Sequence, residues 1–226
     1  AFLDDRAVEG QGRFLGYDAA LRAIVDGQQV LYRYQFASDD TAALVVNNRG
    51  TLLGIEDLQG YNPVQPQRFT AYLTALNGHP QEYHDANVYF GGFNSPLLDL
   101  FNVRYIVIPA NEEAGRPDLQ LLDRVLPTVY EDNRVAILEN DGALPRAWIV
   151  HDARRVETGE ALDMIDSGRV DPRQTALLEV EPPALTPPSD PRADRAELVD
   201  VGHDHLVVAT ATDAPGLLAL SEAYDP

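Results

Sequence analysis

The segment from residue 83 to residue 94 contains the densest mixture of aromatic and polar side chains in the sequence. Aromatic rings stack on the apolar faces of sugars, and amide groups hydrogen-bond sugar hydroxyls. The segment is therefore a candidate binding loop for a glycan or a lipid-linked sugar, although the same rings could instead pack the loop onto a sheet. The residues expected to contact the ligand are His84, Asn87, Tyr89, Phe93 and Asn94.

The turn Gly60-Tyr61-Asn62-Pro63 provides a second set of groups suited to a sugar. Tyr61 could stack on a sugar ring while Asn62 hydrogen-bonds its hydroxyls. The alternative is structural, with Tyr61 covering the core and Asn62 held in an extended conformation by the following proline. The sequence is compatible with both interpretations.

Arg104 lies between apolar residues on a predicted strand. A buried guanidinium requires a carboxylate partner, because an unpaired charge in the interior is strongly unfavourable. We expect a structural ion pair between Arg104 and Asp99, with Asp57 as the alternative partner, rather than a phosphate site.

The remaining polar motifs do not form a recognisable catalytic or metal site. His203 and His205 have the spacing of a two-ligand metal arm beside Asp200 and Asp204, but no third ligand stands at a recognisable spacing, and a solvated turn is expected. Ser221 lacks the Gly-x-Ser-x-Gly elbow of hydrolases. We therefore expect no catalytic residue, no metal and no cofactor within these residues.

Composition excludes some partners and permits others. The 226 residues carry a formal net charge of −19, and all 17 basic residues are arginine. Nucleic acid is not expected as a partner, because it requires a basic surface. The acidic surface is expected to be a solvated one, with cation binding as the alternative. No disulfide or thiolate metal site is possible, because the chain has no cysteine.

No apolar run approaches the roughly 20 residues that a membrane span requires. The first residues, Ala1-Phe2-Leu3-Asp4-Asp5, lack the basic flank and apolar core of a signal peptide. We interpret the sequence as a segment of a longer chain.

The elements that would position these groups can be predicted from periodicity. In the first half, helical spacing predicts helices at residues 16–26, 69–76 and 97–101, and apolar patterns predict strands at 30–36, 42–46 and 103–109. Ser95-Pro96 is a helix start signal, and the strand at 103–109 is apolar on both faces and should be central. Residues 47–50 should form a tight turn.

In the second half, helices are predicted at 117–126 and 158–167, and strands at 129–131, 134–139, 147–151, 175–180, 197–201, 206–212 and 217–223. The fold class is therefore α/β or α+β, a mixed β-sheet with packed helices followed by a small antiparallel β region. We divide the chain into an α/β domain at 1–181, a proline-rich loop or linker at 182–195, and a C-terminal β segment at 196–226.

Four stretches carry a family resemblance. They are residues 54–63 (GIEDLQGYNP), 97–107 (LLDLFNVRYIV), 130–147, which ends in Leu-Pro-Arg-Ala, and 215–224 (PGLLALSEAY). Taken in this order, they resemble the YfhO family of bacterial multi-pass membrane proteins, which are similar to GT-C glycosyltransferases. The resemblance covers most of residues 45–226.

The resemblance implies an extracytoplasmic domain, tethered to the cell membrane through transmembrane helices that precede it and pack against it. Enzymes of the GT-C type use polyprenyl-phosphate sugars, and their catalytic acid lies in an early loop that has no counterpart in residues 1–226. The implied role is that of an accessory domain that binds a glycan acceptor or a lipid-linked sugar. A structural or protein-interaction module is the alternative, and a free-standing soluble enzyme is a third.

Overall fold

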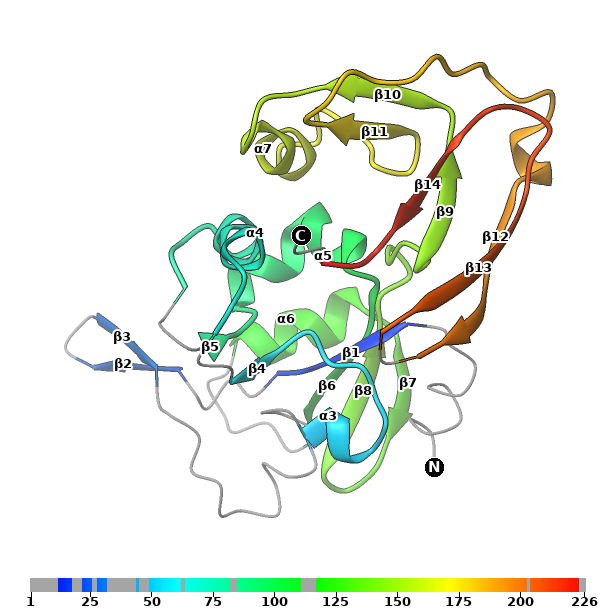
Figure 1. Ribbon diagram of the computed structural model, residues 1–226. Coiled ribbons are helices and arrows are strands. Elements are labelled where there is room, and N and C mark those ends of the chain that lie inside the picture. Colours follow the sequence, from blue (N-terminus) through cyan, green and yellow to red (C-terminus); the bar gives the residue numbers. More distant parts are fainter. Residues whose placement is uncertain are drawn as a thin grey trace.

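The computed structural model describes residues 12–17, 22–25, 28–31, 44, 49–61, 64–81, 85–110, 117–202 and 204–223. These residues form an α+β fold with one four-stranded mixed sheet, several helices packed near it and a group of two-stranded sheets (Figure 1). The expected fold class is therefore confirmed.

The four-stranded sheet has the order β1-β6-β8-β7. Its strands are β1 (Arg13–Gly16), β6 (Val103–Pro109), β8 (Val135–Glu139) and β7 (Thr128–Glu131). Strand β6 pairs in parallel with β1 and antiparallel with β8, so it is an inner strand, as its two apolar faces predict. The hairpin of β7 and β8 is also confirmed.

The two faces of this sheet bury different sets of side chains. Ile106 and Leu138 belong to the larger core, to which the helices α4 (Gln67–Asn77), α5 (Pro96–Leu100), α6 (Pro117–Val125) and α7 (Glu160–Asp166) contribute. Tyr105 and Ile137 belong to the smaller core on the opposite face, where Ile55 covers them. The alternation along β6 and β8 follows from the two-residue period of a strand.

The start of α5 shows why its sequence signal is reliable. The Ser95 hydroxyl oxygen accepts a hydrogen bond from the Leu97 backbone N–H at 3.2 Å, and Pro96 occupies the first helical turn. The same hydroxyl donates to Asp166 Oδ1 at 2.5 Å. The cap therefore also ties α5 to α7.

A second group of strands lies beyond the helices and is built from the second half of the chain (Figure 1). Strand β9 (Ala147–Val150) pairs antiparallel with β14 (Leu217–Leu220), and β12 (Arg195–Val201) pairs antiparallel with β13 (Leu206–Ala211). Strand β10 (Asp152–Arg155) pairs in parallel with β11 (Thr175–Leu178). Residues 182–194 contain one short 3₁₀ turn at Pro191–Ala193 and otherwise form an irregular segment, as their prolines predict.

The early part of the chain differs from its prediction. The expected helix at 16–26 is wrong, because β1 continues to Gly16 and residues Arg22–Val25 form a strand, β2, paired with β3 (Gln28–Leu31). The apolar spacing fits either structure over so short a run, and the β-branched residues before Asp26-Gly27 favour a hairpin. Strand residues predicted at 32–36 lie outside the described residues.

Three further short elements were not predicted. Residues Arg49–Leu52 form a helical turn, α3, where a tight turn was expected, and of the strand expected at 42–46 only Leu44 is described, in a turn. Strands β4 (Gly60–Tyr61) and β5 (Asp85–Ala86) form a two-residue pairing. Strand β10 has the sequence Asp-Ala-Arg-Arg, which contains no apolar alternation, and it exists because its backbone pairs with β11.

Candidate functional site

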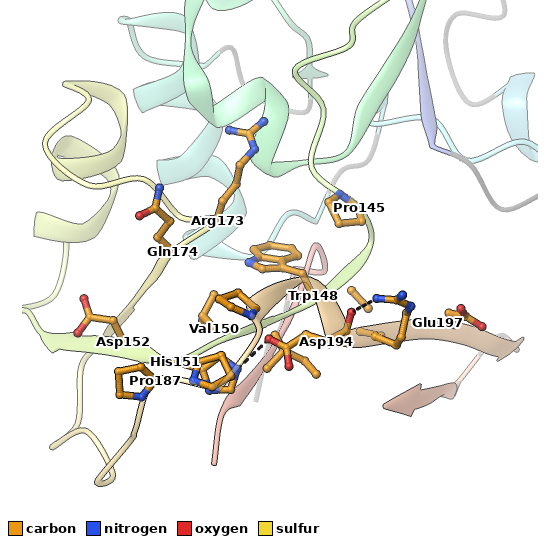
Figure 2. A pocket seen from close by; sticks show the side chains of 16 residues that line it. Pro145, Trp148, Val150, His151, Asp152, Arg173, Gln174, Pro187, Asp194 and Glu197 are labelled. Carbon is orange, nitrogen blue, oxygen red and sulfur yellow. Dashed lines mark hydrogen bonds and ion pairs between the residues drawn. The ribbon is translucent and has the colours of Figure 1, made fainter. Parts of the chain in front are cut away.

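The candidate site is a groove of about 860 Å³ between β9, the start of β12 and the proline-rich segment (Figure 2). Its walls combine apolar side chains with a few charged or amide groups, a composition typical of small-molecule sites. The aromatic, polar and proline residues that line the groove are Trp148, His151, Asp152, Arg173, Gln174, Pro187, Pro188, Pro191, Asp194 and Glu197.

Trp148 lies in the middle of this group of side chains, on strand β9 (Figure 2). Its indole Nε1–H donates a hydrogen bond to the Pro172 carbonyl oxygen at 3.0 Å, and its side chain is half-buried. One edge of the ring is therefore fixed by the protein. A fixed indole in a groove wall can stack on an apolar ligand face with little loss of side-chain entropy.

His151 connects the groove wall to two loops. Its Nδ1 lies 3.0 Å from the Pro215 carbonyl oxygen, and its Nε2 lies 2.9 Å from Asp194 Oδ2. A neutral imidazole has only one N–H, so both contacts are hydrogen bonds only when the ring is protonated. The pKa of His151 is raised, because the hydrogen bonds to Pro215 and Asp194 outweigh the opposing effect of burial.

The pKa of Asp194 is lowered in turn, first by the nearby Thr212 hydroxyl and then by His151. The side chains of His151 and Asp194 are only 10% and 12% exposed. This ion pair holds the proline-rich segment against the end of β9, and so it preserves the width of the groove.

The polar side chains on the other side of the groove are held by hydrogen bonds to nearby backbone and side-chain groups. Arg173 donates to the Gly142 carbonyl oxygen, and Gln174 Nε2 donates to Asp171 Oδ2 at 3.2 Å. Asp152 Oδ2 accepts a hydrogen bond from the Thr175 hydroxyl at 2.7 Å. These groups retain further donor and acceptor capacity, so they can also hydrogen-bond a polar ligand.

Of the sugar-binding residues that the sequence suggested, the described side chains of Asn87, Tyr89, Phe93 and Asn94 do not line this groove. Tyr89 is buried at 3% exposure, with its ring 4.3 Å from that of His79. Phe93 is half-buried and packs edge-on against Tyr17 at 4.9 Å. For Tyr89 and Phe93 the structure therefore agrees with the alternative in which the rings pack the segment onto the protein.

The other members of that set are placed as follows. Asn87 is half-buried, and its carbonyl oxygen accepts a hydrogen bond from Asn77 Nδ2 at 2.9 Å, whereas Asn94 is exposed. The backbone of Tyr61 pairs with Asp85 in the β4–β5 ladder. Asn62 and His84 lie outside the described residues.

The expected ion pair of Arg104 with Asp99 is corrected by the structure. Arg104 pairs with Glu139, whose Oε1 lies 2.9 Å from both Nε and Nη2. Asp99 Oδ1 instead accepts a hydrogen bond from Asn140 Nδ2 at 2.8 Å. The register of β6 against β8 places Tyr105 opposite Glu139, which brings Glu139 beside Arg104, and a sequence does not reveal that register.

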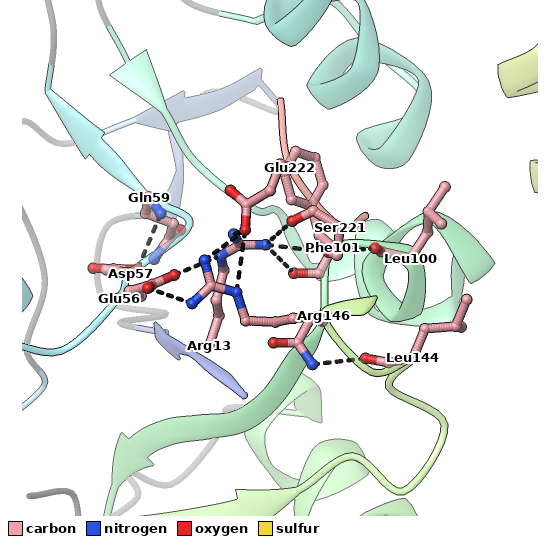
Figure 3. Close-up of polar contacts among 11 residues, drawn as sticks. Arg13, Glu56, Asp57, Gln59, Leu100, Phe101, Leu144, Arg146, Ser221 and Glu222 are labelled. Carbon is pink, nitrogen blue, oxygen red and sulfur yellow. Dashed lines mark hydrogen bonds and ion pairs between the residues drawn. The ribbon is translucent and has the colours of Figure 1, made fainter. Parts of the chain in front are cut away.

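A cluster of four charged residues, here called the arginine clamp, was missed by the sequence analysis. It consists of Arg13, Arg146, Glu56 and Glu222 (Figure 3). Both arginine side chains are only 9% exposed. Three of the four residues lie within the stretches that carry the family resemblance, which is the one signal that could have identified them.

Arg13 makes the most contacts in the clamp. Its Nη1 donates to the carbonyl oxygens of Phe101 at 3.0 Å and Ser221 at 2.5 Å, while Nη2 and Nε bond Glu222 at 2.8 Å and Glu56 at 3.2 Å. Arg146 reaches the same two glutamates, at 2.6 Å to Glu56 and 2.5 Å to Glu222. The clamp is fully engaged with the protein itself, so its role is structural.

Asp57, next to Glu56, has a buried carboxyl group that pairs with no charged group among the described residues. Its Oδ1 accepts a hydrogen bond from the Gln59 N–H at 3.0 Å, whereas Oδ2 is buried and has no hydrogen-bond partner among the described residues. Burial raises its pKa to about 7, and the N–H groups of Gln59 and Leu58 offset only part of that rise.

The described residues contain no group of three or more side chains that could hold a metal ion. His205 contacts Asp204 at 2.9 Å and Asp200 at 3.0 Å, and these carboxylates, Asp204 first, raise its pKa. Its predicted companion His203 lies outside the described residues. Within the part of the chain that the structure describes, no helix is both long enough and apolar enough to cross a membrane.

Comparison with known proteins found no matching protein family, no matching curated protein and no matching solved structure.

Removal of one glutamate tests the arginine clamp. Glu222→Ala should lower the free energy of unfolding by about 2 kcal/mol, because it leaves two largely buried arginines with one carboxylate. Glu179→Ala is the matched control, since Glu179 forms an exposed ion pair with Arg68 at 2.7 Å and should contribute less than about 1 kcal/mol. Urea unfolding measures both, and equal losses would contradict a structural role for the clamp.

The raised pKa of Asp57 predicts how the stability of the protein changes with pH. Its pKa is higher in the folded protein than in the unfolded chain, so the free energy of unfolding falls as pH rises from about 4 to about 7. Asp57→Asn removes this loss and should be more stable than the wild type by up to about 4 kcal/mol at pH 8, but not at pH 4. The exposed Asp132→Asn, whose native pKa is lowered, should show no gain at pH 8 in the same urea series.

Proposed function

We propose that this chain is an extracytoplasmic accessory domain of a polytopic, glycosyltransferase-like membrane protein, and that it binds a glycan acceptor or a lipid-linked sugar without catalysing a reaction itself. The observation that carries the binding role is the groove that contains Trp148 (Figure 2). The membrane tether and the extracytoplasmic location rest on the ordered resemblance to the YfhO family.

The groove has the size and the chemistry that a sugar requires. Its volume of about 860 Å³ lies within the range of small-molecule sites. Trp148 provides an aromatic wall, and Arg173, Gln174 and Asp152 provide donors and acceptors that can reach hydroxyl groups. Three prolines in the opposite wall restrict the backbone, which lowers the entropy lost on binding.

The groups in the groove support binding rather than catalysis. Asp194 is engaged by His151, and Asp152 by Thr175, and neither carboxylate lies beside a nucleophile. The pKa of Asp194 is lowered, which is opposite to the shift that a general acid needs near neutral pH. A binding role therefore fits these residues better than acid–base chemistry.

Trp148 is the only tryptophan in the chain, so its fluorescence reports directly on the groove. Titration with neutral oligosaccharides and with polyprenyl-phosphate sugars should shift its emission in a saturable way. Trp148→Leu should weaken binding at least tenfold in calorimetry, because the stacking surface is lost, whereas Trp148→Phe should keep part of it. Tyr130→Leu, on exposed strand β7, is the control for loss of an aromatic ring elsewhere. The absence of any saturable change with both sugar classes would refute the binding role.

The alternative function is a structural or protein-interaction module. It is favoured by the apolar residues exposed on strands β12, β13 and β14, because exposed apolar surface is where a protein or membrane partner can bind. These residues are Val199, Val201, Val207, Leu218 and Leu220.

Hydrogen exchange distinguishes the two functions. If the domain packs against membrane helices through these strands, the amides of β12 to β14 should exchange more slowly in the intact membrane protein than in the isolated domain, while those of α6 stay unchanged. Equal exchange in both forms would exclude packing through these strands.

A further inference from the structure

A second cavity, of about 540 Å³, lies between α4, α5, α7 and the end of β14. In Figure 1 these three helices surround the place where the chain leaves β14. Its walls are mostly apolar and include Phe69, Tyr72, Phe101, Ala161, Leu162 and Leu220. None of its lining residues is shared with the Trp148 groove, so the two sites are separate.

The aromatic side chains of this cavity are held in place by one another. The ring of Phe101 packs edge-on against Tyr72 at 4.3 Å and against Phe69 at 5.8 Å. The Tyr72 hydroxyl donates a hydrogen bond to the Leu97 carbonyl oxygen at 2.6 Å. The aromatic wall is therefore preformed, and its one polar atom is already used by the protein.

The charged groups around the cavity are also engaged within the protein. Arg68 pairs with Glu179 at 2.7 Å, and Glu222 belongs to the arginine clamp. The Ser221 hydroxyl donates to the Leu100 carbonyl oxygen at 2.7 Å. A charged ligand would have to displace these partners, whereas an uncharged apolar ligand would leave every one of them in place.

We infer that this cavity binds an uncharged aliphatic chain, such as the alkyl or acyl tail of an amphiphile. The site is concave and has the volume of a small-molecule pocket, which suits a chain better than the flat surface of a folded partner. Binding derives from the apolar area that the chain removes from water. This inference is independent of the glycan-binding role proposed above.

The test uses straight-chain alcohols, which carry neither charge nor sugar. Titration with 1-hexanol, 1-octanol and 1-decanol, followed by calorimetry and by NMR shifts of the Ala161 and Leu162 methyl groups, should show one saturable site. Each added CH₂ group should tighten binding about fourfold. An affinity that does not depend on chain length, or NMR shifts confined to other residues, would overturn the inference.

Two matched variants locate the site. Leu220 lines the cavity and is 40% exposed, whereas Leu121 on α6 is 43% exposed and does not line it. Leu220→Gln should weaken 1-decanol binding about fivefold or more, and Leu121→Gln should leave it unchanged. Ala161→Trp, which fills the cavity, should abolish binding while circular dichroism shows a folded protein. Equal effects of the two leucine variants would count against this cavity.

The two proposals can fail separately. A neutral oligosaccharide that saturates the Trp148 groove should not compete with 1-decanol, and Trp148→Leu should bind 1-decanol as the wild type does. Competition between the two ligands would contradict a separate aliphatic site, whereas the loss of sugar binding alone would leave it intact.

Discussion

The buried guanidinium of Arg13 is the group on which the centre of this structure depends. A buried charge is tolerated only when its donors are matched by acceptors, and Arg13, whose side chain is 9% exposed, finds them on segments far apart in the chain. Strand β1 provides the arginine, the end of α5 provides the Phe101 carbonyl oxygen, and the residues after β14 provide Ser221 and Glu222. These segments must pack together, because displacing any one of them would remove a hydrogen-bond partner from the buried guanidinium or expose it to solvent.

The clamp also positions both candidate binding sites. Arg146 directly precedes β9, whose residues line the Trp148 groove, and Glu222 follows β14, whose Leu220 lines the aliphatic cavity. Because β9 and β14 are hydrogen-bonded neighbours, the clamp fixes the position of this strand pair relative to β1 and α5. A change in the clamp is therefore expected to affect both sites through their shared framework.

The groove has a second constraint on its other side. Prolines have no N–H with which to form a ladder, so the segment from 182 to 194 cannot be held by regular backbone pairing. Its place is fixed instead by side chains, chiefly the ion pair between His151 and Asp194. A rigid wall held by a few specific contacts is the arrangement that a preformed binding groove requires.

The sequence by itself determined the helices and strands that depend on residues close together in the chain. The cap at Ser95-Pro96, the strand Val103–Pro109 and the β7–β8 hairpin depend on residues within a few positions of one another, and they were predicted almost to the residue. The region at 16–26 was predicted wrongly, because a short apolar run fits a helix and a strand equally well, and pairing with β3 decides between them.

Only the tertiary structure decided the partners of the charged groups. The choice of Glu139 over Asp99 for Arg104 follows from strand register, and the contact between Arg13 and Ser221 spans 208 positions in the sequence. The groove could not be predicted either, because Trp148, Arg173 and Asp194 meet only after β9 and the proline-rich segment have folded together. Local propensity depends on residues a few positions apart in the sequence. The burial of a charge and the formation of a cavity depend on distant segments that only the complete fold brings together.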